Sequence, residues 1–252
     1  MVEIFSLYMT ALKQQRTIRV YVPKHYDKGE KRYPVLYMHD GQNVFSDDEA
    51  IGGISLGLEQ YLNEQEYELI VVAVDQNPEE RMNEYCPWEI GDYSKKHFGQ
   101  VDLPGGKGKD YVDFIINELK PFIDKRYRTL NNQNSIAGIS LGGLISVYAA
   151  CSYPQVFHKV AALSSAFLRN QEEIETYIQH SNLFGVKGVY MDCGDSETND
   201  EGKNKEFIAS NNRVYELLNN KVPNIKFDII PKGRHHYEDF KKRVPTLLEF
   251  IK

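Results

Sequence analysis

Short apolar runs alternate with helix-like segments along this chain, and this alternation most strongly limits the folds open to it. Two runs, at residues 33–40 and 68–75, are almost continuously apolar and are bounded by turn residues. Such runs are typical of a parallel sheet covered by helices on both faces. The pattern predicts further strands at residues 135–140, 159–165, 186–193 and 225–230. It predicts helices at residues 55–64, 109–124, 141–151, 171–179, 203–219 and 237–251.

The first part of the chain shows a different pattern. Residues 16–24 alternate apolar and polar side chains with a period of two, as a half-buried strand does. They predict an antiparallel edge strand that pairs with residues 4–12. We therefore expect an α/β protein with a mostly parallel eight-stranded sheet and helices on both faces. No linker-like tract divides the 252 residues, so we expect one domain spanning residues 1–252.

Charge and cysteine content narrow the classes of function. A net charge of −6 argues against a nucleic-acid partner, because phosphate binding needs a clustered positive face. The chain begins without a basic segment followed by a long apolar core, and it contains no run of about 18 apolar residues, so we expect a cytoplasmic protein with no membrane partner. Cys86, Cys151 and Cys193 lack the spacing of a disulfide framework or a zinc site. The oligomeric state stays open, with a homo-oligomer among the options.

The pentapeptide Gly-Ile-Ser-Leu-Gly occurs twice, around Ser55 and around Ser140. This pattern can form a tight strand-to-helix turn that raises a nucleophilic serine hydroxyl above a sheet. Ser140 follows a short apolar run and precedes the small apolar residues 143–150, whereas residues 46–50, before Ser55, are acidic and show no strand pattern. We therefore interpret Ser140 as the nucleophile. Ser55 is interpreted as a loop serine or as the cap of a helix at residues 56–62.

A serine nucleophile needs a histidine base and an acid that orients it, and on a sheet of this kind the acid and then the histidine follow the serine. His235 and His236 follow the last predicted strand, where the base is expected, whereas His158 and His180 have structural interpretations. The loop after residues 186–193 supplies the acid. Its candidates are Asp192, inside the strand, and Asp195, Glu197 and Asp200, which the residues alone do not rank.

Two backbone N–H groups are expected to stabilise the oxyanion that forms during acyl transfer. One belongs to Leu141 at the start of a predicted helix, where the helix dipole also favours negative charge. The other belongs to Gln42, because Gly41 permits a close backbone approach in the loop after residues 33–40.

Residues 76–108 show neither helical nor strand periodicity and are rich in aromatic and polar side chains. A loop of this length in a compact domain is usually functional, so we interpret it as the wall of a substrate pocket. Trp88, within it, is a candidate for stacking on a sugar or phenolic ring, and a place in the core is the alternative. Asp40 is a candidate for binding substrate hydroxyl groups or for capping its own loop.

Several fragments, taken in order, resemble the putative-esterase (esterase D-like) family of α/β-hydrolases, and the likeness covers nearly the whole chain. The fragments are RVYVP at 19–23, YMHDGQNVF at 37–45, RMNEY at 81–85, ELKPFID at 118–124, the turn at Ser140 and GRHHYEDF at 233–240. The resemblance implies an α/β-hydrolase fold and an esterase. The family includes acetyl and feruloyl esterases acting on polysaccharides, siderophore trilactone esterases, S-formylglutathione hydrolase and mycolyltransferases.

The resemblance also selects among the open candidates. Family members commonly carry Gly-x-His-x-aromatic near the C-terminus, which implies His235 as the base. They commonly place the acid three residues after a strand-ending glycine, which, counted from Gly194, implies Glu197. The chain departs from the family pattern at Arg234, where a second glycine is common, and at Tyr237 and Phe240, where tryptophans are common. These departures concern the pocket rim and therefore the substrate.

We therefore expect a serine esterase that needs no metal or cofactor and cleaves a small-molecule ester. The resemblance implies an acylated carbohydrate of the acetyl or feruloyl type as the first substrate class and a siderophore trilactone as the second. An acyltransferase, which would pass the same acyl group to a sugar hydroxyl, is a further alternative. The contrasting class is a non-catalytic binding protein of the same fold.

Overall fold

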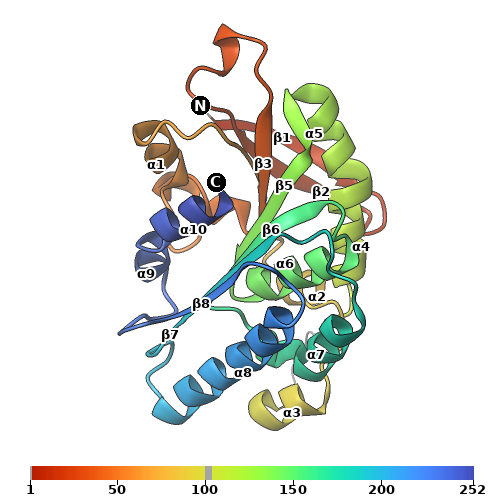
Figure 1. Ribbon diagram of the computed structural model, residues 1–252, viewed down its shortest axis with the longest axis vertical. Coiled ribbons are helices and arrows are strands. Elements are labelled where there is room, and N and C mark those ends of the chain that lie inside the picture. Colours follow the sequence, from red (N-terminus) through yellow and green to blue (C-terminus); the bar gives the residue numbers. More distant parts are fainter. Residues whose placement is uncertain (1, 100–103) are drawn as a thin grey trace.

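The computed structural model describes residues 2–99 and 104–252, and its named strands form one eight-stranded sheet (Figure 1). The strands are β1 (Val2–Met9), β2 (Gln14–Tyr21), β3 (Tyr33–Met38), β4 (Ile70–Val74), β5 (Thr129–Ile139), β6 (Phe157–Leu163), β7 (Gly188–Gly194) and β8 (Ile225–Ile230). Their spatial order is β1-β2-β4-β3-β5-β6-β7-β8. β1 pairs antiparallel with β2, and β2 pairs antiparallel with β4, whereas the other neighbours are parallel. The prediction of a mostly parallel eight-stranded sheet is therefore confirmed.

Helices cover both faces of the sheet, as Figure 1 shows. They are α1 (Leu58–Glu64), α2 (Arg81–Tyr85), α3 (Asp92–Phe98), α4 (Gly108–Phe114), α5 (Lys120–Arg126), α6 (Leu141–Ser152), α7 (Gln171–His180), α8 (Glu201–Asn219), α9 (Tyr237–Lys241) and α10 (Val244–Ile251). One core cluster joins a sheet face to α1, α9 and α10, and another joins the opposite face to α4, α6, α7 and α8. Leu58 and Leu62, one turn apart on α1, are fully buried. Such burial contributes about 1.5 to 3 kcal/mol for each side chain.

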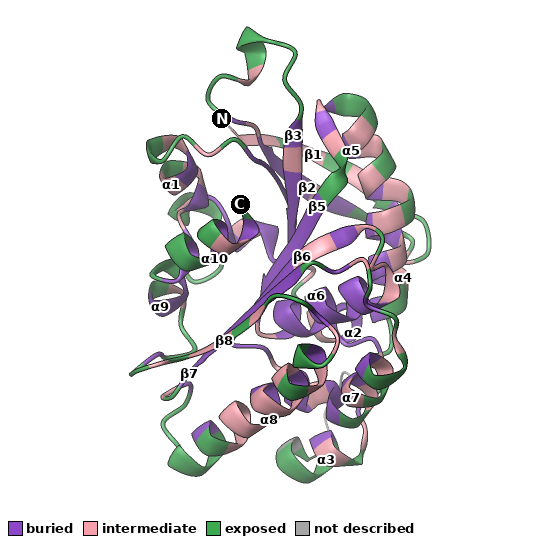
Figure 2. Cartoon of the chain, viewed as in Figure 1, coloured by how far each residue is buried: buried purple, intermediate pink, exposed green. Residues whose placement is uncertain are grey.

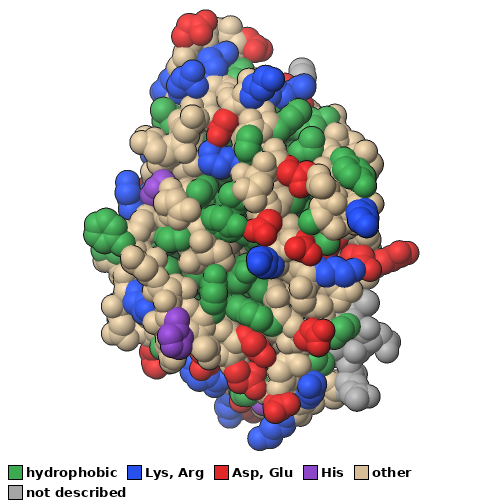
Figure 3. All heavy atoms as spheres, turned by 90° about the vertical axis from the view of Figure 1, so that its right-hand side faces the viewer, with side chains coloured by type: hydrophobic (Ala, Val, Ile, Leu, Met, Phe, Trp, Pro, Cys, Tyr) green, Lys and Arg blue, Asp and Glu red, His purple; other side chains and the backbone are tan. Residues whose placement is uncertain are grey.

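The central strands are buried on both faces, as the apolar runs require. All five residues of β4 and all seven of β7 are buried, and the middle of the sheet is purple in Figure 2. α6 is also buried along its length apart from Ser152, which explains why its sequence is small and apolar rather than amphipathic. On the face drawn in Figure 3, basic and acidic side chains are interspersed among scattered apolar ones.

Three helical predictions need correction. The first predicted helix begins at Leu58 rather than at residue 55, after Gly57 adopts the left-handed conformation with φ 65°. The predicted helix at 237–251 is broken into α9 and α10, and Pro245 occupies the first turn of α10, where its missing N–H is tolerated. The stretch 76–108, predicted to lack helices, contains α2 and α3. Residues 100–103 of that stretch lie outside the described residues.

The carboxyl ends of the parallel strands meet along one edge of the sheet, and ligands of open α/β sheets bind outside that edge. β5 ends immediately before Ser140, and β6 ends immediately before Ser164. Glu197 and His235 follow β7 and β8 by a few residues. The topology therefore brings residues far apart in the sequence to one place. Within the described residues, none of the helices combines the length and apolarity needed to cross a membrane.

Candidate active site

Ser140 occupies a strained turn between β5 and α6. Its φ of 60° and ψ of −121° place a residue that has a side chain in a region such residues rarely adopt, at a cost of about 1 to 3 kcal/mol. Hydrogen bonds hold the turn: the Ser140 N–H donates to Leu163 O at 2.9 Å, and the N–H groups of Gly143 and Ala166 donate to Ser140 O at 3.0 Å. The surrounding backbone therefore fixes the serine in this conformation.

Two glycines of this turn, Gly138 and Gly143, are required by close contacts. A Cβ on Gly138 would lie 2.2 Å from the backbone oxygen of Gly142, and one on Gly143 would lie 2.0 Å from Ser165 Oγ. A Cβ on Gly142 itself would meet nothing nearer than 3.5 Å. The strand and helix thus approach each other as a tight strand-to-helix turn demands.

The second copy of the pentapeptide folds differently. Ser55 is fully buried, and its hydroxyl donates to Asp47 Oδ1 at 2.7 Å and accepts from the Gly57 N–H at 3.0 Å. It lies in a loop, three residues before α1 begins at Leu58, so the helix-capping interpretation of Ser55 is wrong and the loop interpretation holds. The same five residues form two structures because only one copy follows a strand.

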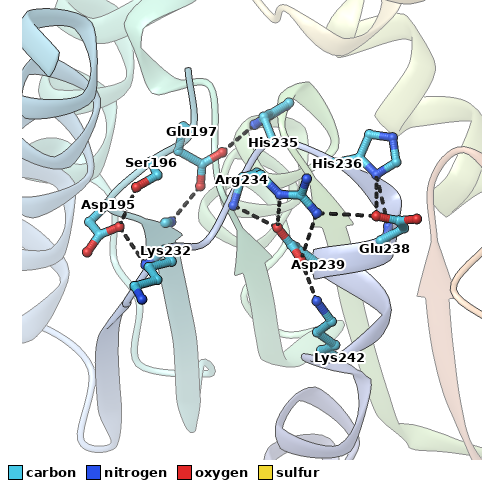
Figure 4. Close-up of polar contacts among 11 residues, drawn as sticks. Asp195, Ser196, Glu197, Lys232, Arg234, His235, His236, Glu238, Asp239 and Lys242 are labelled. Carbon is cyan, nitrogen blue, oxygen red and sulfur yellow. Dashed lines mark hydrogen bonds and ion pairs between the residues drawn. The ribbon is translucent and has the colours of Figure 1, made fainter. Parts of the chain in front are cut away.

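His235 and Glu197 are hydrogen-bonded, as Figure 4 shows. His235 Nδ1 lies 2.6 Å from Glu197 Oε2, and the imidazole is about one third exposed whereas the carboxylate is buried. Burial opposes ionisation of Glu197, but hydrogen bonds from His235 and Ser164 outweigh it and lower the pKa of this carboxyl below its ordinary value. Glu197 is therefore a carboxylate that holds the Nδ1 side of the ring and leaves the opposite nitrogen available.

The competing acids bind other groups. Asp195 is exposed and accepts hydrogen bonds from Ser196 Oγ at 2.8 Å and the Lys232 N–H at 2.7 Å (Figure 4). Asp192 is fully buried and accepts from Arg243 Nη1 at 2.9 Å, and burial raises its pKa to about 6. Asp200 caps α8 by accepting from the Lys203 N–H. Of the four candidates, the structure brings only Glu197 to His235.

The other histidines considered from the sequence also lie elsewhere. His236 caps α9 by accepting from the Glu238 N–H at 3.3 Å, and its ring lies near the Glu238 carboxylate (Figure 4). His180 Nδ1 bonds the carbonyl of Thr176 at 2.8 Å at the end of α7. His158 lies within β6 at the opposite end of that strand from Ser164. His235 is thus the member of this set that is paired with a loop carboxylate after β7.

Two cavities open beside Ser140, and we name each by a lining residue. The Asp40 cavity, of about 380 Å³, is lined by Asp40, Asn43, Gln76, Arg81, His236 and Tyr237 together with Ser140 and His235. The Phe207 cavity, of about 350 Å³, is lined by Met82, Leu141, Leu168, Arg169, Lys203 and Phe207 together with Ser140, His235 and Arg81. Ser140, His235 and Arg81 therefore lie where the two cavities share walls.

The loop after β3 contributes an ion pair to this site. Asp40 is 4% exposed and binds Arg81, whose guanidinium also lies over the ring of Tyr85. The Asp40 side chain makes no capping hydrogen bond to its own loop, so the capping alternative is wrong. Next to it, His39 is buried between Tyr111 and Ser146, and burial lowers its pKa to about 4.

The two residues predicted to supply oxyanion-stabilising N–H groups differ in their position relative to the cavities. Leu141 lines the Phe207 cavity beside Ser140, at the N-terminus of α6. Gln42 is not among the described residues that line either cavity, and its side-chain amide exchanges two hydrogen bonds with the backbone of Gln76. The donor role of the Gln42 N–H stays a prediction.

Trp88 lies away from both cavities. It is half-buried and packs edge-on against Tyr148 and Tyr177, with ring centroids 5.2 and 5.4 Å apart. These contacts place Trp88 at the margin of the core, as the alternative interpretation had it, and its stacking on a substrate ring stays a prediction. The stretch 76–108 still forms part of the cavity walls, through Gln76, Arg81, Met82 and His97.

Sequence reasoning did not single out two buried residues that lie behind Glu197. Ser164 Oγ donates to Glu197 Oε1 at 2.5 Å, and Arg243 Nη1 donates to Ser164 Oγ at 2.7 Å. Neither residue belongs to a local motif. Across residues 2–99 and 104–252, no cluster of three or more His, Cys, Asp or Glu side chains is arranged to hold a metal ion.

Comparison with known proteins agrees with this architecture. Residues 9–251 match the sequence profile of the family described as putative esterase. An IroE-like serine hydrolase from Shewanella oneidensis is similar over the whole of this chain and 79% of its own, with a TM-score of 0.78 and 19% identity. A ferulic acid esterase is similar over the whole of this chain and 97% of its own, with a TM-score of 0.70 and 23% identity. Siderophore hydrolase EstA from Aspergillus nidulans is similar over 98% of this chain and 94% of its own, with a TM-score of 0.76 and 16% identity. At these identities the likeness is one of fold, the α/β-hydrolase fold.

Proposed function

Because this chain belongs to the putative esterase family, we propose that it is a serine esterase in which Ser140, His235 and Glu197 form the catalytic triad. The observation that supports this assignment best is the 2.6 Å hydrogen bond between His235 and buried Glu197, because His235 lines both cavities that Ser140 also lines. A nucleophile, a base and a group that orients the base are what acyl transfer by serine requires.

The proposed reaction begins with the Ser140 hydroxyl attacking the ester carbonyl while His235 accepts its proton. Glu197 holds Nδ1, so the proton arrives at Nε2, and the negative carboxylate stabilises the imidazolium that forms. The backbone N–H of Leu141, at the N-terminus of α6, stabilises the oxyanion, and we propose the N–H of Gln42 as the second donor. His235 then returns the proton to the leaving alcohol, and water hydrolyses the acyl-enzyme.

We propose an acylated carbohydrate as the substrate class. The Asp40 cavity presents the carboxylate of Asp40, the side-chain amide of Gln76 and the guanidinium of Arg81, which suit several hydroxyl groups at once. The Phe207 cavity carries apolar side chains, including Met82, Leu168 and Phe207, which suit an acyl chain or an aromatic acid. The similar ferulic acid esterase gives a precedent within the fold.

A siderophore ester is the second candidate. Arg81, Arg169 and Lys203 line the Phe207 cavity together with Glu197 and Glu206, so cationic side chains outnumber carboxylates there and favour an anionic, oxygen-rich ligand. The similar EstA is named a siderophore hydrolase. Initial rates with an acetylated sugar, a feruloylated sugar and a catecholate trilactone, measured at equal enzyme concentration, rank the two classes. A trilactone preference of at least about tenfold in kcat/KM, about 1.4 kcal/mol, would replace the carbohydrate proposal.

The two pentapeptides provide a matched test of the nucleophile. We expect Ser140→Ala to abolish turnover of p-nitrophenyl acetate and labelling by a fluorophosphonate probe. Ser55→Ala, which changes the same residue in the same five-residue context, is expected to keep both per folded molecule. Labelling of Ser140→Ala at the wild-type rate would overturn the proposal, and an unlabelled wild-type protein would favour the non-catalytic binding class.

A further inference from the structure

Glu197 is held by more than His235. Its Oε1 accepts a hydrogen bond from Ser164 Oγ at 2.5 Å and another from the Gly194 N–H at 2.5 Å, while Oε2 faces His235. A carboxylate with one oxygen bound from two directions cannot rotate without breaking both bonds. The orientation of Oε2 toward the imidazole therefore depends on the groups that bind Oε1.

Ser164 is itself fixed from behind. It is fully buried, follows β6 directly and has a φ of 43°, a strained left-handed conformation for serine. Its single hydroxyl proton is used toward Glu197, so the Ser164 oxygen is left to accept, and Arg243 Nη1 donates to it at 2.7 Å. The direction of the Ser164 hydroxyl is thus set by Arg243.

Arg243 joins this chain of contacts to the neighbouring strand. It is 4% exposed, and the same Nη1 donates to Asp192 Oδ1 at 2.9 Å within β7. Its guanidinium also lies 5.2 Å from the ring centroid of Phe240, whose ring packs edge-on against His235 at 5.2 Å. Arg243 is therefore connected to His235 in two ways, through Ser164 and Glu197 and through the ring of Phe240.

The charges of this buried cluster are uneven. Arg243 contacts Asp192 directly and Glu197 only through Ser164, so with both carboxylates ionised one guanidinium serves two negative charges and one is left over. That charge is balanced when His235 takes up a proton. Because buried charges are costly unless they are paired, the cluster favours the imidazolium that proton transfer from serine would create.

We propose that Arg243 and Ser164 are positioning residues of the triad, acting on His235 through Glu197. This inference rests on the proposed function of Ser140, His235 and Glu197. Ser164 fixes the Glu197 carboxylate, and Arg243 fixes Ser164 and sets how much net negative charge lies behind the imidazole.

The variants Ser164→Ala, Arg243→Gln and Arg243→Lys test the proposal, with Arg234→Gln as the matched control. Arg234 lies next to His235 in the sequence, but it is not among the described residues that line either cavity, contrary to the pocket-rim prediction, and its exposed guanidinium binds Asp239 (Figure 4). The other charged groups around His235 stay the same in all four variants. They are Asp40, Arg81, Arg169, Glu197, Lys203 and Glu206, with His97 and His236 nearby.

We expect Ser164→Ala to lower kcat for p-nitrophenyl acetate about 10-fold or more with little change in KM, because a hydrogen bond to a charged group is lost. Arg243→Gln is expected to lower kcat similarly and to move the acidic limb of the kcat/KM profile to higher pH, because loss of a cation makes the imidazolium easier to form. Arg243→Lys is expected to return that limb toward the wild-type position. Arg234→Gln is expected to leave both kcat and the limb unchanged.

An ion pair that only stabilised the fold would lower the thermal midpoint and the yield without moving the acidic limb. If Arg243→Gln does not fold, Ser164→Ala carries the test, because it leaves Asp192 its cation. The inference would be overturned by a wild-type kcat in folded Ser164→Ala, or by wild-type pH profiles in both folded Arg243 variants. In either case an inactive Ser140→Ala would leave the proposed triad in place. An active Ser140→Ala would overturn the proposed function itself.

Discussion

Arg81 binds Asp40 through two parallel hydrogen bonds, 2.7 Å from Nε to Oδ1 and 2.8 Å from Nη2 to Oδ2. The pair connects α2 to the loop after β3, and both side chains line the Asp40 cavity next to Ser140. A paired guanidinium and carboxylate present donors and acceptors in a fixed orientation. We therefore propose that the pair binds substrate as well as holding α2.

We predict that Arg81→Gln lowers the free energy of unfolding by about 2 kcal/mol, because it leaves the Asp40 carboxylate buried without its cation. This loss is smaller than the loss of about 3 to 5 kcal/mol expected on breaking a fully buried ion pair, because the Arg81 side chain is about a quarter exposed. We also expect KM to rise for acetylated sugars more than for p-nitrophenyl acetate, which has no hydroxyl groups to bind. Urea unfolding and steady-state kinetics measure the two effects.

The double variant Asp40→Asn with Arg81→Gln separates the two roles of the pair. It removes the unpaired charge, so unfolding stability is expected to return most of the way to wild type. KM for the sugar ester is expected to stay raised, because the charged groups are still missing. An unchanged KM for the sugar ester in both variants would remove the pair from substrate binding.

Glu197 and Asp195 allow a direct test of the orienting acid. Glu197→Gln keeps the shape but cannot stabilise the imidazolium, so we expect kcat to fall by about 100- to 10,000-fold. Asp195→Asn is expected to change kcat by less than about threefold, because Asp195 binds Ser196 and the Lys232 N–H rather than His235. A larger loss of kcat in Asp195→Asn would transfer the role to that residue.

The close packing of the turn around Ser140 predicts different effects of alanine substitution at Gly138 and Gly142. A Cβ on Gly138 would lie 2.2 Å from Gly142 O, so Gly138→Ala must open the turn and displace the serine. We expect a loss of about 100-fold in kcat/KM and about 1 to 3 kcal/mol in stability. Gly142→Ala meets its nearest neighbour at 3.5 Å and is expected to keep stability within about 1 kcal/mol. Equal activity of the two variants would contradict the steric argument.

The strands were predictable because burial leaves a local signature, which is a nearly continuous apolar run in the central strand β3 and an apolar-polar alternation in β8, a half-buried strand at the sheet edge. The run at 225–230 matches β8 residue for residue, and the run at 33–40 exceeds β3 by only two residues. Helix starts were less predictable, because they depend on contacts and backbone conformations that lie outside the helix itself. α1 begins late since Asp47 draws Ser55 into the loop and Gly57 turns left-handed. The apolar periodicity of residues 55–64 carries no information about these interactions, so it does not predict where the helix begins.

The candidate site divides in the same way. Ser140 and the region of His235 follow from the chain order of strands and helices, which is a local pattern repeated along the sequence. The choice of Glu197 needed the family resemblance, because three carboxylates share one loop and a fourth, Asp192, lies in the strand before it. The pairing of Ser164 with Arg243 joins residues 79 positions apart, and that of Asp40 with Arg81 joins residues 41 apart. The sequence does not show which charged or hydroxyl side chains will be partners in the folded protein, so these pairs could be identified only from the three-dimensional structure.

His39 predicts how stability depends on pH. Its ring is buried and bonded to Tyr111 and Ser146, and burial lowers its pKa to about 4, against about 6.5 in an unfolded chain. The unfolded state therefore binds the proton more readily, so protonation favours unfolding. The stability contribution is fully present above about pH 6.5 and is lost as pH falls toward about 4, by about 3 kcal/mol in total.

His39→Gln removes this titration and keeps a polar side chain of similar size. Urea unfolding at about pH 7.5 and about pH 4.5 is expected to show the wild type losing about 2 to 3 kcal/mol more than the variant. Asp192, whose pKa burial raises to about 6, has the opposite sign: its contribution is lost as pH rises through about 4 to 6. Since both proteins contain Asp192, its effect cancels in the comparison. Equal losses in the two proteins would mean that His39 is protonated within the fold and that its bonds to Tyr111 and Ser146 rearrange on acidification.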